Sequence, residues 1–192
     1  MAIDTGDTTW MLIATGLVFL MTPALGFFES GLIRLKNSLS VIMQTMTGMV
    51  LLSTLWFIVG YTLVFGVDVS GIIGDLSNVF YNNVPYNDSV DLAPTIPGIT
   101  FATYQMMFAV ITPLLITGAF AERMKWSAFF IFVILWSLVV YYPLAHWIWG
   151  GGWLAEIGVY DFAGGIVIHV SAGMAALASA LVLGRRKGFG PE

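Results

Sequence analysis

One ionisable side chain stands in the middle of a long apolar segment, which makes it the first candidate for chemistry. His169 lies between the uncharged stretches 162–168 and 170–184. An imidazole gains and releases a proton near neutral pH. Such a group at membrane depth is rare and indicates a function by default. Two interpretations are open: a group lining a path for a proton or ligand, and a histidine hydrogen-bonded between packed helices.

Asp161 lies at the start of the same segment. At α-helical spacing Asp161, Gly165 and His169 share one stripe, which is rich in small residues further along. Small residues mark a face that packs against another helix, so we expect His169 to point into the protein. The carboxylate of Asp161 is suited to capping the helix, or to shaping a vestibule for a cation.

Aromatic residues form a second group of candidates. Tyr104 and Phe108 are four residues apart and share a helix face, either as membrane core or as rings at a pore. Trp149 opens a Trp-Gly-Gly-Gly run. Its indole is suited to anchoring at the membrane interface or to binding a cation on its face. The glycines let neighbouring backbone approach closely or break the helix.

No constellation of residues predicts an enzyme or a metal site. The sequence has no cysteine and no second ligand close to His169. It also lacks the motifs of a nucleophilic serine or a phosphate-binding loop. We expect Glu29 to be an interfacial or ion-paired carboxylate, and Glu122 with Arg123 to pair at the inner face. The sequence therefore predicts no catalytic residue and no cofactor.

The elements that must position these residues are membrane-spanning helices. The chain has 192 residues, of which 58% are hydrophobic and 9% charged, against about 25% charged in soluble domains. The low charge excludes a soluble or disordered chain, and 7 Lys and Arg with a net charge of −4 exclude nucleic-acid binding. The fold class is an all-α bundle in a lipid bilayer. Uncharged windows predict five helices, at about 9–28, 38–66, 98–121, 126–148 and 162–184, with an extracellular loop at 67–97.

Charge placement predicts the orientation of these helices. The basic residues follow the first, third and fifth helices, at Arg34, Lys36, Arg123, Lys125, Arg185, Arg186 and Lys187. The positive-inside rule places these segments in the cytoplasm and the N-terminus outside. The acids on the predicted outer side are Asp4, Asp7, Asp68, Asp75, Asp88, Asp91, Glu156 and Asp161.

Four motifs together resemble the Amt/Rh ammonium transporter family, on its Amt/Mep side. They are Gly31–Asn37 (GLIRLKN), Ile116–Arg123 (ITGAFAER), Pro143–Gly152 (PLAHWIWGGG) and Asp161–His169 (DFAGGIVIH). Members of this family have eleven helices, with two inverted repeats around an apolar pore, and form trimers. The resemblance implies that residues 1–192 are the N-terminal half of such a domain and that the second repeat is absent from this chain.

The resemblance also implies roles for the candidate residues. Trp149, Phe108, Tyr104 and Asp161 correspond to an outer site that recruits ammonium, with Phe108 also part of a gate. Tyr104 stands where phenylalanine is common. Asp161 is expected to organise this site rather than bind ammonium directly. His169 corresponds to the first of two pore histidines on the proton route. The second histidine, the second gate phenylalanine and a recruitment serine would come from the other repeat.

The function implied is uptake of ammonium across the cell (plasma or inner) membrane, in which ammonium loses its proton and ammonia crosses the pore. The partners implied are ammonium or ammonia, the lipid bilayer, two further copies in a homotrimer, and a PII-type regulatory protein. Alternatives are an ammonium sensor that signals to a cytoplasmic domain, a truncated membrane scaffold without transport, and a Rh-type gas channel.

Overall fold

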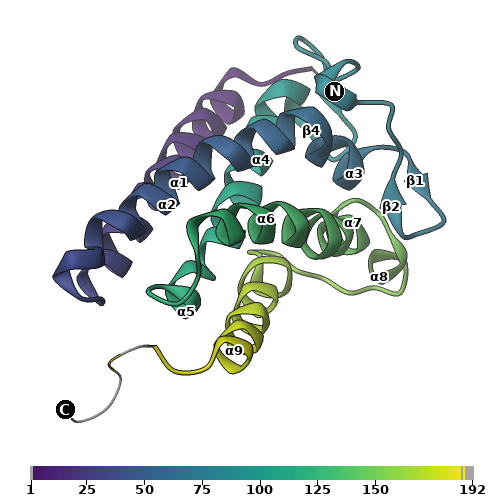
Figure 1. Ribbon diagram of the computed structural model, residues 1–192. Coiled ribbons are helices and arrows are strands. Elements are labelled where there is room, and N and C mark those ends of the chain that lie inside the picture. Colours follow the sequence, from purple (N-terminus) through teal and green to yellow (C-terminus); the bar gives the residue numbers. More distant parts are fainter. Residues whose placement is uncertain (1, 187, 189–192) are drawn as a thin grey trace.

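The computed structural model describes residues 2–186 and 188 (Figure 1). Within those residues it has five helices long and apolar enough to cross a membrane. They are Thr5–Gly31, Leu35–Phe65, Gly98–Phe120, Trp126–Glu156 and Gly165–Leu183, called spans 1 to 5 below. The predicted all-α fold with five membrane-spanning helices is confirmed.

Most spans are built from several pieces. Span 1 is α1 (Thr5–Gly31) and span 2 is η1 (Leu35–Asn37), α2 (Ser38–Leu55), η2 (Trp56–Gly60) and α3 (Tyr61–Phe65). Span 3 is α4 (Gly98–Leu114) and α5 (Thr117–Phe120). Span 4 is α6 (Trp126–Trp136), η4 (Ser137–Tyr141), α7 (Tyr142–Trp149) and α8 (Trp153–Glu156). Span 5 is η5 (Gly165–Val170) and α9 (Ser171–Leu183).

The segment between spans 2 and 3 is more ordered than the predicted loop. It contains two antiparallel hairpins and one short helix: β1 (Asp68–Val69) with β2 (Ile73–Gly74), η3 (Val79–Tyr81), and β3 (Ser89–Val90) with β4 (Ala93–Pro97). The second hairpin also holds the start of α1, because the N–H of Asp4 donates to the carbonyl of Thr95 at 2.8 Å.

Span 3 lies at the centre of the packing. In its most apolar 18-residue window 61% of the residues are buried, against 17% in spans 1 and 5. The core includes the fully buried side chains of Leu52 and Trp56 from span 2, Leu114 from span 3, and Phe129 and Tyr142 from span 4. Spans 1 and 5 therefore flank the core with largely exposed apolar faces.

A π-helical turn interrupts spans 2 and 4, at η2 and η4, and another begins span 5, at η5. Such a turn carries more residues than an α-turn and shifts the face of everything that follows. In span 5 the N–H of His169 donates to the carbonyl of Gly164, five residues back, at 3.1 Å. The α-spaced stripe predicted from Asp161 to His169 is therefore wrong. Gly165 and His169 are both exposed in this chain, so the surroundings of His169 in the whole protein stay a prediction.

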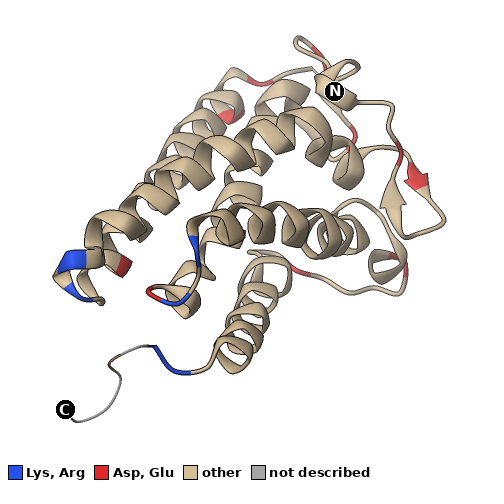
Figure 2. Ribbon diagram, viewed as in Figure 1, with Lys and Arg blue, Asp and Glu red and all other residues tan. Residues whose placement is uncertain are grey.

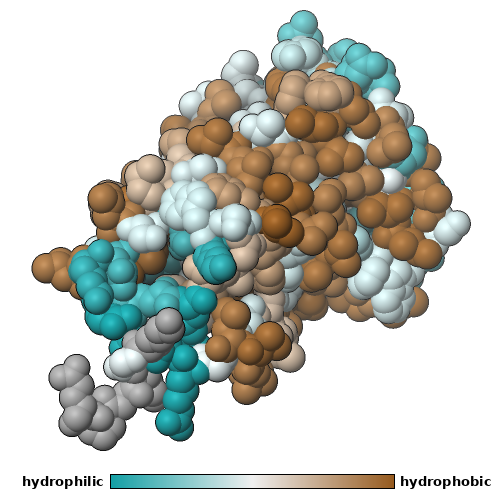
Figure 3. Space-filling model, viewed as in Figure 1, coloured by the Kyte–Doolittle hydropathy of each residue, from teal (hydrophilic) through white to brown (hydrophobic). Residues whose placement is uncertain are grey.

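Charge separates along the helices as expected for a membrane protein. Among the described residues, Figure 2 shows Lys and Arg only at one end, which we call the basic end. Most Asp and Glu lie toward the other end, which carries the hairpins and which we call the cavity end. In Figure 3 apolar residues cover the middle of the visible face between hydrophilic ends. Lys187, the remaining basic residue of the orientation argument, lies outside the described residues.

Candidate functional site

A cavity of about 700 Å³ opens at the cavity end, between spans 3, 4 and 5. The four residues predicted to form an outer site all line it: Tyr104, Phe108, Trp149 and Asp161. Gly164 and Ile168 close it on the side of span 5. Helical spacing predicts that Tyr104 and Phe108 are neighbours, but it says nothing of residues on other helices. The packing of the spans brings Trp149 and Asp161 close to this pair.

The rings of Tyr104 and Phe108 contact each other edge to face, with centroids 4.9 Å apart and planes at 82°. Both belong to α4 and both side chains are half-buried. This T-shaped arrangement is a preferred geometry for aromatic pairs. Each ring therefore restrains the other at the cavity wall, as their four-residue spacing predicted.

Trp149 ends α7 and is fixed at its polar edge. Its indole N–H donates to the backbone carbonyl of Asp161 at 2.9 Å. The three glycines that follow allow the close approaches around it. A Cβ on Gly150 would lie 2.0 Å from the carbonyl oxygen of Val64, and Gly151 has a φ of +85°. The glycine run therefore brings the backbone of span 2 against the end of α7.

Asp161 joins this tryptophan to the start of span 5. Its carboxylate accepts the N–H groups of Gly165 and Ile166 at 2.8 Å and of Val167 at 2.9 Å. It therefore caps the helix, as one of the two sequence interpretations predicted, and an anion is favoured there. Backbone N–H groups occupy the carboxylate oxygens of Asp161, and the indole N–H of Trp149 occupies its backbone carbonyl. Asp161 therefore links Trp149 to the start of span 5 at the wall of the cavity.

His169 is not among the residues that line this cavity. Its neighbour Ile168 faces the cavity, while His169 itself lies on the exposed side of span 5. The structure therefore brings together four of the five predicted site residues and leaves His169 apart from them. In the described residues no group of three or more His, Asp or Glu side chains is placed to hold a metal ion.

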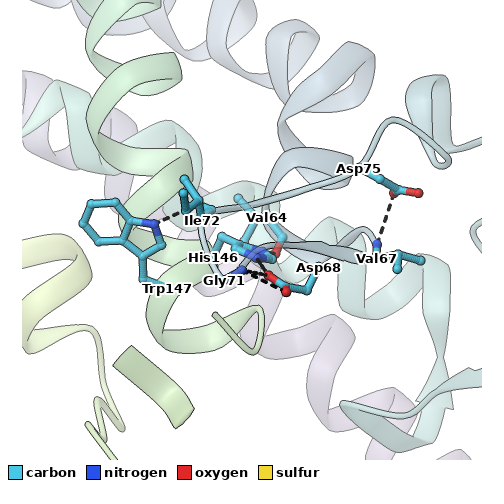
Figure 4. Close-up of polar contacts among 8 residues, drawn as sticks. All are labelled: Val64, Val67, Asp68, Gly71, Ile72, Asp75, His146 and Trp147. Atoms are coloured by element: carbon cyan, nitrogen blue, oxygen red, sulfur yellow. Dashed lines mark hydrogen bonds and ion pairs between the residues drawn. The ribbon is translucent and has the colours of Figure 1, made fainter. Parts of the chain in front are cut away.

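Sequence reasoning missed His146, which is fully buried in span 4 (Figure 4). Its Nδ1 lies 2.7 Å from the carbonyl oxygen of Val64 and its Nε2 lies 2.9 Å from Oδ1 of Asp68. Its position between Pro143 and the glycine run was visible in the sequence, but its partners are 82 and 78 residues away.

Glu29 is buried near the end of α1, and neutral donors hold it. The hydroxyl of Thr117 donates to one carboxylate oxygen, and the N–H of Gly118 donates to the other at 3.0 Å. The break between α4 and α5 presents these donors to Glu29 close to the basic end of span 1.

The predicted pairing at the basic end is confirmed around Glu122. Its side chain is 1% exposed and contacts Arg34 at 2.9 Å, Arg186 at 3.0 Å and the amide of Asn37 at 2.5 Å. The guanidinium of Arg34 is the main cause that lowers the pKa of Glu122 to about 2. Arg123 donates to the carbonyl of Gly184 at 2.8 Å. These contacts join the ends of spans 1, 3 and 5.

Comparison with known proteins agrees with this architecture. The model of the Ammonium Transporter Family matches residues 9–192. Ammonium transporter 1 of Dictyostelium discoideum is 57% identical over 187 residues, which are 97% of this chain and 40% of that protein. The putative ammonium transporter of Methanothermobacter thermautotrophicus is 50% identical and is covered to 46%. The chain therefore spans less than half the length of these relatives.

Solved structures show the same fold. The crystal structure of Candida albicans Mep2 matches with a TM-score of 0.87 and 39% identity, over 96% of this chain and 40% of that one. A structure described as a Sensor Amt Protein matches with a TM-score of 0.83 and 30% identity, over 94% of this chain and 44% of that one. With five membrane-spanning helices and a family match over almost its whole length, the chain belongs to the ammonium transporter family.

Proposed function

We propose that this chain supplies the ammonium recruitment site and one wall of the pore of an ammonium transporter. The observation that carries the proposal is the cavity in which Tyr104, Phe108 and Trp149 meet above the capped start of span 5. A set of aromatic faces without a basic residue among them suits a small cation. The chain's relatives are named ammonium transporters, which gives that cation its identity.

The energetics explain why such a site would stand before an apolar path. Moving a bare ammonium ion from water into an apolar medium costs on the order of tens of kcal/mol. A cation on a desolvated aromatic face recovers only about 2 kcal/mol. Release of the proton removes most of the remaining cost, because neutral ammonia crosses an apolar path cheaply. A potassium ion has no proton to release, so the same path would reject it.

The residues would divide this work. Trp149 and Tyr104 offer their faces to the cation, Phe108 closes the way inward as a gate, and Asp161 fixes Trp149 and the start of span 5. His169 would carry the proton on the side of span 5 that is exposed in this chain. The residues that cover that side would come from the second repeat, since the Dictyostelium relative is more than twice as long. A transporter works by permeation and does not convert its substrate into another compound, so the protein is proposed to be no enzyme.

The distribution of charge and of exposed apolar faces suggests how the protein lies in the membrane and what it binds. The basic end would face the cytoplasm and the cavity would open to the outside of the cell membrane. The exposed apolar faces of spans 1 and 5 are consistent with further helices and further copies, in a homotrimer. A PII-type regulator would bind at the basic end.

Flux measurement tests this proposal directly. The protein as its cell makes it would be purified, reconstituted in vesicles and exposed to equal inward gradients of ammonium or potassium chloride. We expect ammonium-dependent uptake, no potassium uptake, and a raised KM for Trp149→Leu. A protein that carries neither ion would overturn transport. His169→Ala with the uptake of the parent would overturn the proton route and leave recruitment intact.

A sensor built on the same fold is the second candidate. The likeness to a Sensor Amt Protein favours it, at 30% identity. A sensor would bind ammonium in this cavity without net flux, so ammonium binding measured by calorimetry alongside absent uptake would support it. A scaffold without transport would show neither binding nor uptake.

A further inference from the structure

The β1–β2 hairpin is attached to span 4 just before Trp149 (Figure 4). Asp68, at the start of the hairpin, contacts Nε2 of His146 at 2.9 Å. The indole N–H of Trp147 donates to the carbonyl of Ile72, near the hairpin's other strand, at 2.7 Å. Two consecutive residues of α7 are thus held by one hairpin, although about 75 residues separate them from it along the chain.

The same hairpin is attached again just after the glycine run. The N–H of Trp153 donates to the carbonyl of Gly71 at 3.0 Å. Between the two attachments the chain turns tightly on His146, whose carbonyl accepts the N–H groups of Gly150 and Gly152 at 3.0 Å each. Trp149 lies within this turn, so the hairpin holds the chain both before and after Trp149.

The contact between Asp68 and His146 defines where the protons are. The carbonyl oxygen of Val64 has no proton to give, so Nδ1 of His146 must carry one to make the 2.7 Å contact. Asp68 also accepts the N–H of Gly71 at 2.9 Å on both oxygens. The hydrogen bond with His146, followed by the one from Gly71, lowers the pKa of the carboxyl. An ionised carboxylate has no proton to give either, so Nε2 carries the second one.

We propose that Asp68 and His146 are positioning residues for ammonium recruitment, and that their carboxylate–imidazolium pair holds Trp149 in place through the turn at Gly150–Gly152. The inference rests on the proposed function, because it assigns these two residues a task at that site. A charged pair is suited to this task, since charge-assisted hydrogen bonds are shorter and stronger than neutral ones. The ring of His146 is fully buried, and 2.9 Å separates its Nε2 from Oδ1 of Asp68, whose side chain is partly exposed.

The test compares two aspartates of the same outer segment. Asp68→Asn keeps the shape of the side chain and removes its charge. Asp88→Asn removes the same charge from an exposed side chain, and so controls for weaker attraction of a cation to the surface. In vesicles with equal amounts of protein we expect Asp68→Asn to raise the KM for ammonium about five-fold with Vmax within two-fold. We expect Asp88→Asn to leave both constants unchanged.

A merely structural role would lower Vmax through loss of folded protein and leave KM unchanged. The ¹⁵N spectrum of His146 gives a second readout that does not depend on transport. Assigned by comparison with His146→Gln, it should show two protonated ring nitrogens in the parent and one in Asp68→Asn. A neutral imidazole in the parent would overturn the charged pair.

Transport by the parent and by Asp68→Asn distinguishes failure of the positioning role from failure of the proposed function. A parent that transports ammonium, with the same KM in Asp68→Asn, would overturn the positioning role and leave the proposed function standing. A parent that does not transport ammonium would overturn the proposed function and this inference with it. A raised KM in Asp68→Asn alone, together with the doubly protonated imidazole, supports the inference.

Discussion

Around Trp149 and Asp161 the contacts run from side chains to backbone groups, whereas around Glu122 they join charged side chains to one another. Asp161 accepts three backbone N–H groups, and Trp149 donates to a backbone carbonyl. Glu122 instead binds two arginines that come from different segments of the chain. Hydrogen bonds to backbone groups fix the position of a side chain closely. The strength of an ion pair with a partly exposed guanidinium instead depends on salt and on the ionisation of the carboxylate. The contacts at the cavity therefore fix positions closely, whereas those around Glu122 hold the segments together in a way that depends on pH and salt.

Substitution of Gly150 is expected to have the largest effect, because it acts on the closest backbone approach at the cavity end. In Gly150→Ala the new Cβ would lie 2.0 Å from the carbonyl oxygen of Val64 and 2.6 Å from Nδ1 of His146. Span 4 must move, which should destabilise the protein by about 3 kcal/mol and abolish ammonium uptake. Thermal unfolding in detergent and vesicle uptake measure both.

Gly16→Ala is the matched control for this substitution. Gly16 also lies in a span, but a Cβ there meets nothing within 4 Å. It should unfold at the temperature of the parent or slightly above, because alanine favours helix. Equal melting temperatures for the two variants would contradict a tight backbone contact at Gly150.

Removal of the Asp161 carboxylate should have the next largest effect. Asp161→Ala leaves three N–H groups at the start of span 5 without their acceptor, which should cost about 2 kcal/mol and raise the KM for ammonium. Asp161→Asn keeps one acceptor oxygen and should be intermediate in both. An Asp161→Ala protein with the KM of the parent would show that the cap is not needed to shape the cavity.

The basic end should reveal its charged contacts through pH. The pKa of Glu122 is about 2, below its ordinary value of 4.5, chiefly because of Arg34. A carboxyl with a lowered pKa in the folded state contributes stability that is fully present above pH 4.5 and is lost as the pH falls toward 2. Melting temperatures between pH 6 and 2.5 should therefore fall less steeply in Glu122→Gln than in the parent. Glu156→Gln, at an exposed glutamate of the cavity end, should retain the slope of the parent.

The features that the sequence could predict are those that depend on residues close together in the chain. The five spans follow from long uncharged windows, and the cap at Asp161 and the close approach at the glycine run follow from local residue types. All of these depend on neighbours in the chain. The α-helical stripe from Asp161 to His169 was wrong because the π-helical turn η5 changes the helix phase without a clear signal in residue type.

Contacts between distant segments were also beyond the sequence. His146 finds Asp68 across 78 residues, and Glu29 finds Thr117 across 88. The sequence shows these residues but not that they are neighbours. The packing of span 4 against the end of span 2 brings His146 to Asp68, and the packing of spans 1 and 3 brings Glu29 to Thr117. The grouping of the four cavity residues could nevertheless be predicted, because the resemblance to a family carries information on packing that periodicity lacks. The structure places all four in the wall of one cavity.

The smallest predicted effect separates shape from polarity within the cavity itself. Tyr104 holds Phe108 by its ring, whose edge-to-face contact at 4.9 Å does not involve the hydroxyl. Tyr104→Phe should therefore change the KM for ammonium less than about two-fold, since the aromatic contact is retained. Tyr104→Leu, which removes the ring but keeps an apolar side chain, should raise KM several-fold in the same uptake assay. If Tyr104→Phe instead matched Tyr104→Leu, the hydroxyl would be the group that ammonium meets, and the cavity end would depend on polarity as the basic end does.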